Sequence, residues 1–507
     1  MSPSSEASPS VKASWAEYDY KVRSELRAPR GKTKSKGNFT PFVNRELELQ
    51  TSLDALERSK EFHAFVEAVR TAVIADEYHM GGISFWEQAV RNALRRSGYY
   101  YGFFAGRVAS SQTVLKRVLR AFEPHDINIT YLAPMEYVCM EVPQIACRNF
   151  SIRKFTQAEL DDLLKTEICG LFYPRAVINT GFLCSYWFIV VKEKRSLRPI
   201  GKIGGDFGSI GKVTLQYSPY PALEKVLNSL VMYNWLPDWA NYERRGKGKK
   251  RTEWKGWLGF KIPFVIRITD NILDSPRPAP NLEQLETEPY FDPHTNEELG
   301  EKPSWYINLD KEQTRALERC ITTVDTMLGK VESLGPSSSF LRRGQGFLVK
   351  GFFTKGLEQL LWHMTALETL FGENRPGLTQ LIAQRVALVL GETKDQRTAI
   401  KRQFTELYEL RSNLVHGSEL KIEIWQGHLK DARDLARCSL LWFLSFMVEI
   451  SKAARHSSIA MLPERKELLA VLDSRSEAIV GLARILQSVP PSFPAVDAWQ
   501  EPWNLSP

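Results

Sequence analysis

Residues 407–417 read Leu-Tyr-Glu-Leu-Arg-Ser-Asn-Leu-Val-His-Gly, and this stretch decides how the C-terminal part of the chain folds. At about 100° per residue, the apolar residues between Phe404 and Val415 form one stripe of a helix, which indicates packing on a core. Arg411 falls inside that stripe, where a guanidinium is costly unless another group pairs with it. His416 follows five residues later and can exchange protons near neutral pH. Because arginine binds phosphate and histidine moves protons, the pair indicates chemistry on a phosphodiester.

A second core-facing helix is expected at residues 357–371, where apolar residues recur at i, i+3 and i+4. Glu368 lies on the edge of that apolar face. Two core helices would then each carry one inward charge, and the two charges have opposite sign. We therefore expect Glu368 and Arg411 to meet, directly or through water, with spare guanidinium donors left for a ligand.

The histidine does not share a helix face with the arginine. Five steps of about 100° place His416 about 140° around the helix from Arg411, unless the helix ends or distorts there. Gly417 provides a plausible end. The side chains that align with the histidine or lie near it are Tyr408, Ser412 and Asn413. We expect them to select its tautomer or to contact a substrate.

Composition predicts a folded protein without a cofactor. The 507 residues suit two or more domains, and 43% hydrophobic content suits real cores. A net charge of +8 permits a polyanionic partner without requiring one. None of the 6 cysteines forms a C-x-x-C pair, so we expect buried free thiols and no metal site. Neither a secretory signal nor a span of about 20 apolar residues is found, so a cytoplasmic protein without a membrane partner is expected.

The pattern along the chain predicts a multidomain α+β protein. Residues 1–45 are basic and are expected to be a disordered tail, with a nucleic-acid arm as the alternative. Residues 46–300 are expected to form a mixed α/β sensing or regulatory domain of unknown type. Residues 305–455 are expected to form an all-α helical bundle, followed at 456–507 by a last helix and an irregular tail.

Within residues 46–300, several elements can be placed from local signals. The capping box Thr156-x-x-Glu159 predicts the start of a helix. The acidic, proline-containing residues 286–302 suit a linker to the bundle. Further helices are expected at 47–75 and 114–122, and strands at 183–192, 212–217 and 260–269.

Residues 241–255 form a second candidate site. They hold seven basic and two acidic residues, with tryptophans on either side. Cations beside aromatic rings suit phosphates and stacked bases, whereas the alternative is an exposed hairpin loop above core tryptophans. The candidate nucleic-acid-binding residues are Arg244, Arg245, Lys247, Lys249, Lys250, Arg251 and Trp254.

The string Leu407-Tyr408-x-x-Arg411-Ser412-x-x-Val415-His416-Gly417 resembles the R-x4-H signature of the HEPN superfamily, and specifically its Apea-like branch. The upstream run of residues 365–371, Thr-Ala-Leu-Glu-Thr-Leu-Phe, also matches, so the resemblance covers about residues 310–455. It implies an α-helical bundle that dimerises. Many relatives are metal-independent ribonucleases in which motifs from two subunits form a composite site.

Carried over to this chain, the resemblance makes Arg411 the phosphate clamp and His416 the general acid or base. The RNA 2′-hydroxyl attacks, leaving a 2′,3′-cyclic phosphate, while Ser412, Asn413, Tyr408 and Glu368 are supporting residues. One position departs from the family, which often has Asn, Asp or His directly after the arginine, where this chain has Ser412. Asn413 lies one place on. Some family members have lost catalysis.

We therefore expect a homodimeric or larger assembly that cleaves RNA in phage defence or a toxin-like response, with a phage or protein trigger. The alternative is a non-catalytic dimerisation platform whose N-terminal domain binds nucleic acid or protein. In that case Arg411 and Glu368 merely fix the helix register, and His416 interacts with the last carbonyls of its helix.

Overall fold

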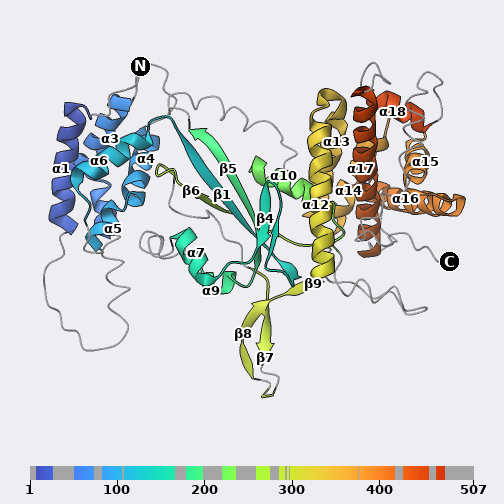
Figure 1. The fold of residues 1–507 in the computed structure, drawn as a ribbon, viewed down its shortest axis with the longest axis horizontal. Coiled ribbons are helices and arrows are strands. Elements are labelled where there is room, and N and C mark those ends of the chain that lie inside the picture. Colours follow the sequence, from blue (N-terminus) through green and yellow to red (C-terminus); the bar gives the residue numbers. More distant parts are fainter. Residues whose placement is uncertain are drawn as a thin grey trace.

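The chain combines helices with a central sheet, as seen in a computed structural model (Figure 1). The structure describes residues 7–26, 51–73, 83–104, 108–165, 178–197, 220–235, 259–274, 285–291, 294–295, 297–374, 376–416, 426–455 and 464–473. In Figure 1 the sheet lies between a group of N-terminal helices and a C-terminal group of helices. Within the described residues, no helix is long and apolar enough to cross a bilayer.

The N-terminal helices form a core of their own, built largely from aromatic rings. The ring of Trp15 lies 5.0 Å from that of Phe65 and 5.3 Å from that of Tyr99, between centroids. Inside this core the hydroxyls of Tyr18 and Tyr100 share a hydrogen bond of 2.6 Å. The helices are α1 (Pro9–Leu26), α3 (Lys60–Val73), α4 (Ile83–Arg96), α5 (Tyr99–Phe104) and α6 (Ser111–Ala121).

The prediction of a disordered tail at residues 1–45 is wrong for residues 9–26, which form α1. Val11, Trp15, Tyr18 and Val22 are buried there at i, i+4, i+7 and i+11 spacing, so one face of the helix packs on its neighbours. The basic residues that suggested a tail lie mostly after residue 26, whereas α1 itself holds three basic and three acidic residues. Residues 27–45 lie outside the described residues.

A 5-stranded antiparallel sheet follows, in the order β3-β4-β5-β1-β6. Its strands are β1 (His125–Met135), β3 (Gln144–Ala146), β4 (Phe150–Arg153), β5 (Trp187–Leu197) and β6 (Ile266–Thr269). The expected strands at 183–192 and 260–269 are confirmed in kind, with shifted bounds. The strand expected at 212–217 lies outside the described residues.

The two faces of the sheet pack on different helices because successive side chains of a strand alternate between faces. On one face Ile129 and Tyr131 join the core that includes α10 (Pro221–Leu230). On the other face Leu132 joins α7 (Gln157–Leu164) and α9 (Thr180–Leu183). The capping box predicted at the start of α7 is confirmed, with both of its hydrogen bonds present.

The expectation of a single mixed domain at residues 46–300 needs correction. The described residues up to Phe122 are helical and share a core with α1, whereas the sheet begins at His125. The two regions are joined by polar contacts as well as by the chain. Asn92 Nδ2 donates to the carbonyl of Leu273 at 2.9 Å, and Arg96 donates to the carbonyl of Thr269.

The acidic segment at 286–302 is a hairpin, not a linker. It forms β7 (Thr287–Phe291) and β8 (Glu298–Pro303), which project from the body of the protein (Figure 1). Directly afterwards, β9 (Trp305–Leu309) pairs in parallel with β2 (Tyr137–Met140). Because β9 leads straight into the next helix, the sheet region and the bundle are joined without a flexible segment.

The C-terminal region is helical, as predicted. It contains α12 (Lys311–Glu332), η5 (Gly335–Ser338), α13 (Ser339–Phe352), α14 (Gly356–Phe371), α15 (Leu378–Leu390), α16 (Lys394–Val415), α17 (Gln426–Arg455) and α18 (Arg465–Leu472). One apolar core runs continuously from the sheet through α10 into these helices. The bundle therefore does not form a separate unit with its own core, although the sequence places a domain boundary near residue 300.

Helix α13 was not predicted, because its glycines lower the helix propensity of the segment. Tertiary packing explains them. A Cβ on Gly351 would lie 2.6 Å from Cδ2 of His363, and one on Gly344 would lie 3.1 Å from Cδ2 of Leu370. The glycines thus allow α13 and α14 to approach closely, and this packing outweighs the lost propensity.

We predict that Trp15→Ala destabilises the N-terminal helices by about 3–5 kcal/mol, because its buried ring and the hydrogen bond from its Nε1 to Ser111 Oγ at 2.7 Å are lost. Hydrogen exchange of α3 and α4 amides measures this local free energy. Tyr20→Ala on the same helix is the control, since Tyr20 is 77% exposed. Equal exchange in both variants would show that α1 does not belong to this core.

A second prediction concerns His363, which is fully buried between α13 and α17. Burial and then nearby Arg433 lower its pKa from 6.5 to about 3, with Asp434 opposing. The unfolded chain therefore binds one more proton between these pH values, so stability is full above about pH 6.5 and is lost as pH falls.

His363→Leu should remove this dependence, because leucine does not titrate. Between pH 7 and pH 4.5 we expect the urea-unfolding free energy of the variant to fall by about 2–3 kcal/mol less than that of the wild type. His125→Leu, on β1, serves as the control and should keep the wild-type slope. If the unfolding free energy changed with pH equally in the wild type and in both variants, burial of a neutral His363 would not be the source of the pH dependence.

Candidate functional site

The predicted meeting of Glu368 and Arg411 is confirmed. Glu368 comes from α14 and Arg411 from α16, and Nη2 of the arginine donates to Oε2 of the glutamate at 3.3 Å. The side chains are 22% and 24% exposed respectively. The pair therefore lies at the edge of the core, where solvent or a ligand still reaches it.

Local sequence explains how α16 presents the arginine. A capping box between Thr393 and Gln396 fixes the start of the helix, and Ile400, Phe404, Leu407 and Leu410 form its buried stripe. Arg411 follows the stripe at its border with solvent. The guanidinium is thus half-buried instead of fully enclosed. The free-energy cost of removing its charge from water is therefore lower than for an arginine inside the core.

Tyr408 links three helices at this site. The guanidinium carbon of Arg411 lies 5.6 Å from the centroid of its ring, a cation–π arrangement. Its hydroxyl lies close enough to Glu368 and to Thr379 of α15 for both to influence its pKa. Burial, and then the charge of Glu368, raise the pKa of Tyr408, so the phenol stays protonated beside the carboxylate. Sequence reasoning missed Thr379, because no local pattern connects the start of α15 with the end of α16.

The guanidinium keeps hydrogen-bonding capacity. Arg411 Nε is a buried atom without a hydrogen-bond partner within the described part of the chain, so a ligand would reach the guanidinium through its Nη atoms. A guanidinium carries five N–H donors, and the bond to Glu368 uses one of them. The arrangement can therefore hold an oxyanion while Glu368 and the Tyr408 ring fix the plane of the group.

His416 ends α16, as the glycine after it predicted, although Gly417 itself lies outside the described residues. Its backbone N–H donates to the carbonyl of Ser412 at 3.0 Å, and its side chain is exposed. Ser412 is half-buried and Asn413 is exposed. Within a single chain the imidazole is thus open to solvent and free to meet a second molecule.

The basic segment at 241–255 lies outside the described residues, together with all seven of its candidate contacts. Trp235, just before it, is fully buried, donates from Nε1 to the carbonyl of Leu230 at 2.7 Å and packs 4.8 Å from the ring of Phe260. Trp235 is therefore a core residue, as the alternative interpretation of this segment expected.

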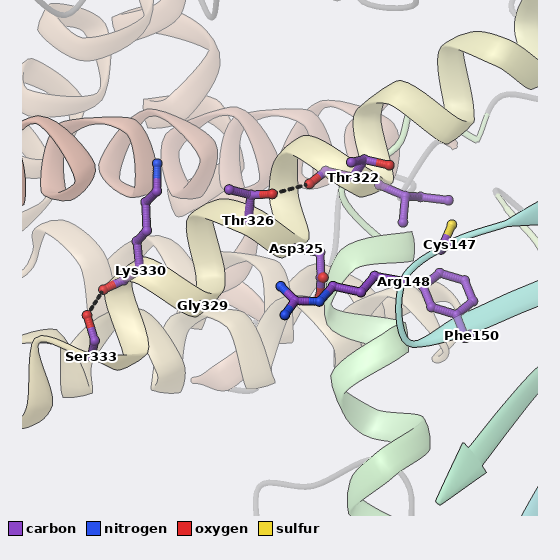
Figure 2. Close-up of a pocket in the computed structure, with 10 residues that line it drawn as sticks. Cys147, Arg148, Phe150, Thr322, Asp325, Thr326, Gly329, Lys330 and Ser333 are labelled. Atoms are coloured by element: carbon purple, nitrogen blue, oxygen red, sulfur yellow. Dashed lines mark hydrogen bonds between the residues drawn. The ribbon is translucent and has the colours of Figure 1, made fainter.

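A cavity of about 470 Å³ lies elsewhere, between α12 and the turn that joins β3 to β4 (Figure 2). Thr322, Thr326 and Gly329 line it from α12, opposite Cys147 and Arg148. Burial raises the pKa of the Cys147 thiol to about 12, so the cysteine is protonated and a poor nucleophile. None of the predicted site residues lines this cavity.

Within the described ranges, no group of three or more His, Cys, Asp or Glu side chains is arranged to hold a metal ion. No protein-family model, curated protein or solved structure matches this chain. Any proposal for the function of this protein therefore rests on the motif around Arg411 and His416 and on the geometry of the site.

We predict that Glu368→Ala lowers the free energy of unfolding by about 1 kcal/mol, because the half-buried ion pair with Arg411 and its hydrogen bond are lost. Urea unfolding at pH 7 measures the change. Glu409→Ala removes an exposed carboxylate of α16, two residues before Arg411, and is the control that should stay within about 0.5 kcal/mol of the wild type. Equal losses of unfolding free energy in the two variants would show that the Glu368–Arg411 pair contributes no more than an ordinary surface carboxylate.

Proposed function

We propose that this protein is a metal-independent endoribonuclease of HEPN type, in which Arg411 binds the scissile phosphate and His416 transfers protons. One observation carries the proposal: a guanidinium oriented by Glu368, with donors to spare, lies on the last turns of a helix that ends in an exposed histidine. The resemblance of the surrounding string to the HEPN signature supports it.

The residues would act as follows. Arg411 donates to a non-bridging phosphate oxygen and stabilises the charge that develops there. The imidazole of His416 accepts the proton of the RNA 2′-hydroxyl as the 2′-oxygen bonds to phosphorus. The bond between phosphorus and the 5′-oxygen breaks, and that oxygen takes a proton from a solvent water molecule. The products are a 2′,3′-cyclic phosphate and a 5′-hydroxyl end.

The mechanism requires two copies of the chain. On a regular helix Arg411 and His416 would lie about 140° apart, and His416 follows the last residue of α16 as its C-cap, so we do not expect this helix end alone to aim both at one phosphate. A two-fold assembly can place the arginine of one copy beside the histidine of the other. Val415, which is 54% exposed beside the histidine, offers an apolar contact for such an assembly. We further propose that cleavage serves phage defence or a toxin-like response after a trigger.

One observation favours the alternative of a non-catalytic platform. Glu368 already offsets part of the charge of Arg411, as it would in an ion pair that only fixes the register of α14 against α16. In that case the protein dimerises and binds nucleic acid or protein without turnover.

Cleavage of a labelled RNA with EDTA present tests the proposal. We expect the wild type to produce cyclic-phosphate ends, and His416→Ala and Arg411→Ala to be slower by about 100-fold or more, because each loses a proton-transfer group or a charge clamp. Glu409→Ala is the control for a surface change on α16. Equal cleavage by all variants would exclude these residues as catalysts, and RNA binding without cleavage by the wild type would favour the platform.

Mixing the two inactive variants tests the composite site. If one copy supplies arginine and the other histidine, a mixed dimer of Arg411→Ala and His416→Ala contains one intact site and recovers cleavage. A mixture as inactive as its components, in a preparation shown to exchange subunits, would contradict the shared site.

A further inference from the structure

The surface formed by α13 and the start of α14 is basic, with four cations against one carboxylate, Glu358. Residues 339–357 contain four basic side chains and no acidic one: Arg342, Arg343, Lys350 and Lys355. Arg343, Phe347 and Lys350 recur at i, i+4 and i+7, so they share one face of α13. Arg343 is exposed, whereas Phe347 and Lys350 are half-buried. This face therefore presents cations to solvent with an aromatic ring between them.

The aromatic ring on this face is part of a stack. Phe347 and Trp362 of α14 lie 5.6 Å apart between centroids, with their planes 14° from parallel. The Lys350 ammonium lies 4.9 Å from the Trp362 centroid. Trp362 Nε1 donates to Oε1 of Glu358, one turn earlier, at 3.0 Å, which fixes the indole. The two rings are half-buried, so a preassembled aromatic column reaches the surface.

The column is connected to the candidate site along α14. Trp362, Thr365 and Glu368 are spaced at i, i+3 and i+6, which makes them one ridge of the helix, and all three are half-buried. Six residues span about 9 Å along the axis. A strand that stacks on Trp362 can therefore follow the ridge to the Glu368–Arg411 pair.

We propose that the column of Phe347 and Trp362, with Lys350 and Arg343, is a binding platform for single-stranded RNA that leads to Arg411. An unpaired base extends the stack, and the two cations contact the adjoining phosphates. Duplex RNA does not fit this role, because its bases are already stacked on each other and closed to a protein ring. Binding of the strand stands on the surface itself, whereas cleavage of the bound strand rests on the proposed ribonuclease function.

Packing alone does not account for this surface. Arg343 and Lys350 are like charges on one face of α13, so their placement there does not stabilise the helix. Glu358 is the carboxylate that faces the column, and it bonds to the indole edge and not to its ring face. Rings that only needed burial would lie inside the core, as Trp235 does. A basic face around stacked rings matches a polyanion with planar bases.

Binding is measured on His416→Ala protein by fluorescence polarisation, with an unpaired oligoribonucleotide and with the same sequence in a duplex. We expect the unpaired strand to bind more tightly and Trp362→Ala to weaken it by about five- to a hundredfold, while Trp362→Phe retains most of the affinity. Lys350→Gln should weaken binding and flatten its salt dependence. Trp305→Ala, an exposed tryptophan on β9, and Lys394→Gln on α16 are the matched controls.

The outcomes separate the platform from the catalyst. If Trp362→Ala and Lys350→Gln bind the unpaired strand like the controls, or if duplex binds equally well, the platform is wrong even where the wild type cleaves RNA. If both variants lose binding while wild-type protein with intact His416 cleaves nothing, the platform stands and the ribonuclease proposal fails. Circular dichroism of each variant establishes that a loss of binding does not come from unfolding.

Discussion

Burial of α17 is the constraint on which the rest of the structure depends. Most of this helix is enclosed, including Lys430, Arg433, Asp434 and Arg437. Such charges are tolerated only when partners surround them, and here Lys430 bonds to Asp434 at 2.7 Å while Arg437 donates to the carbonyl of Met232 at 3.2 Å. The partners come from both α17 and the chain after α10. The sheet region and the bundle are thus held together by one core, and neither buries α17 alone.

The candidate site follows from this arrangement. Helices α14 and α16 both pack on α17, which fixes where Glu368 and Arg411 meet and keeps the pair at the edge of the core. At the C-terminal side of α14, fully buried Arg385 bonds to Glu373 at 2.7 Å and to Asp473, just after α18, at 2.6 Å. The C-terminal end of α14, which carries Glu368, is therefore held in place by contacts with Arg385 of α15. The Glu368–Arg411 pair therefore has little conformational freedom, which would favour the phosphate binding that we propose for it.

Much of the site could be predicted from the sequence, because the spacing of apolar residues along a helix is a local property. The stripe of α16, the inward Glu368 and the helix end at His416 follow from spacing alone, and the structure confirms each of them. The proximity of Thr379 to Tyr408 and the stacking of Phe347 on Trp362 could not be predicted, because each contact joins residues of two different helices. Helix α1 was missed because the charge of the whole segment 1–45 was judged together, although the basic excess lies mostly after residue 26.

The sequence by itself determined the helical C-terminal region, the capping box at Thr156, strands β5 and β6 and the pairing of two opposite charges, because each depends on short-range spacing or simple charge matching. Only the tertiary structure decided that residues 287–303 form a hairpin, that glycine-rich α13 is a helix and that sheet and bundle share a core. These features depend on contacts between distant segments, where packing outweighs local propensity.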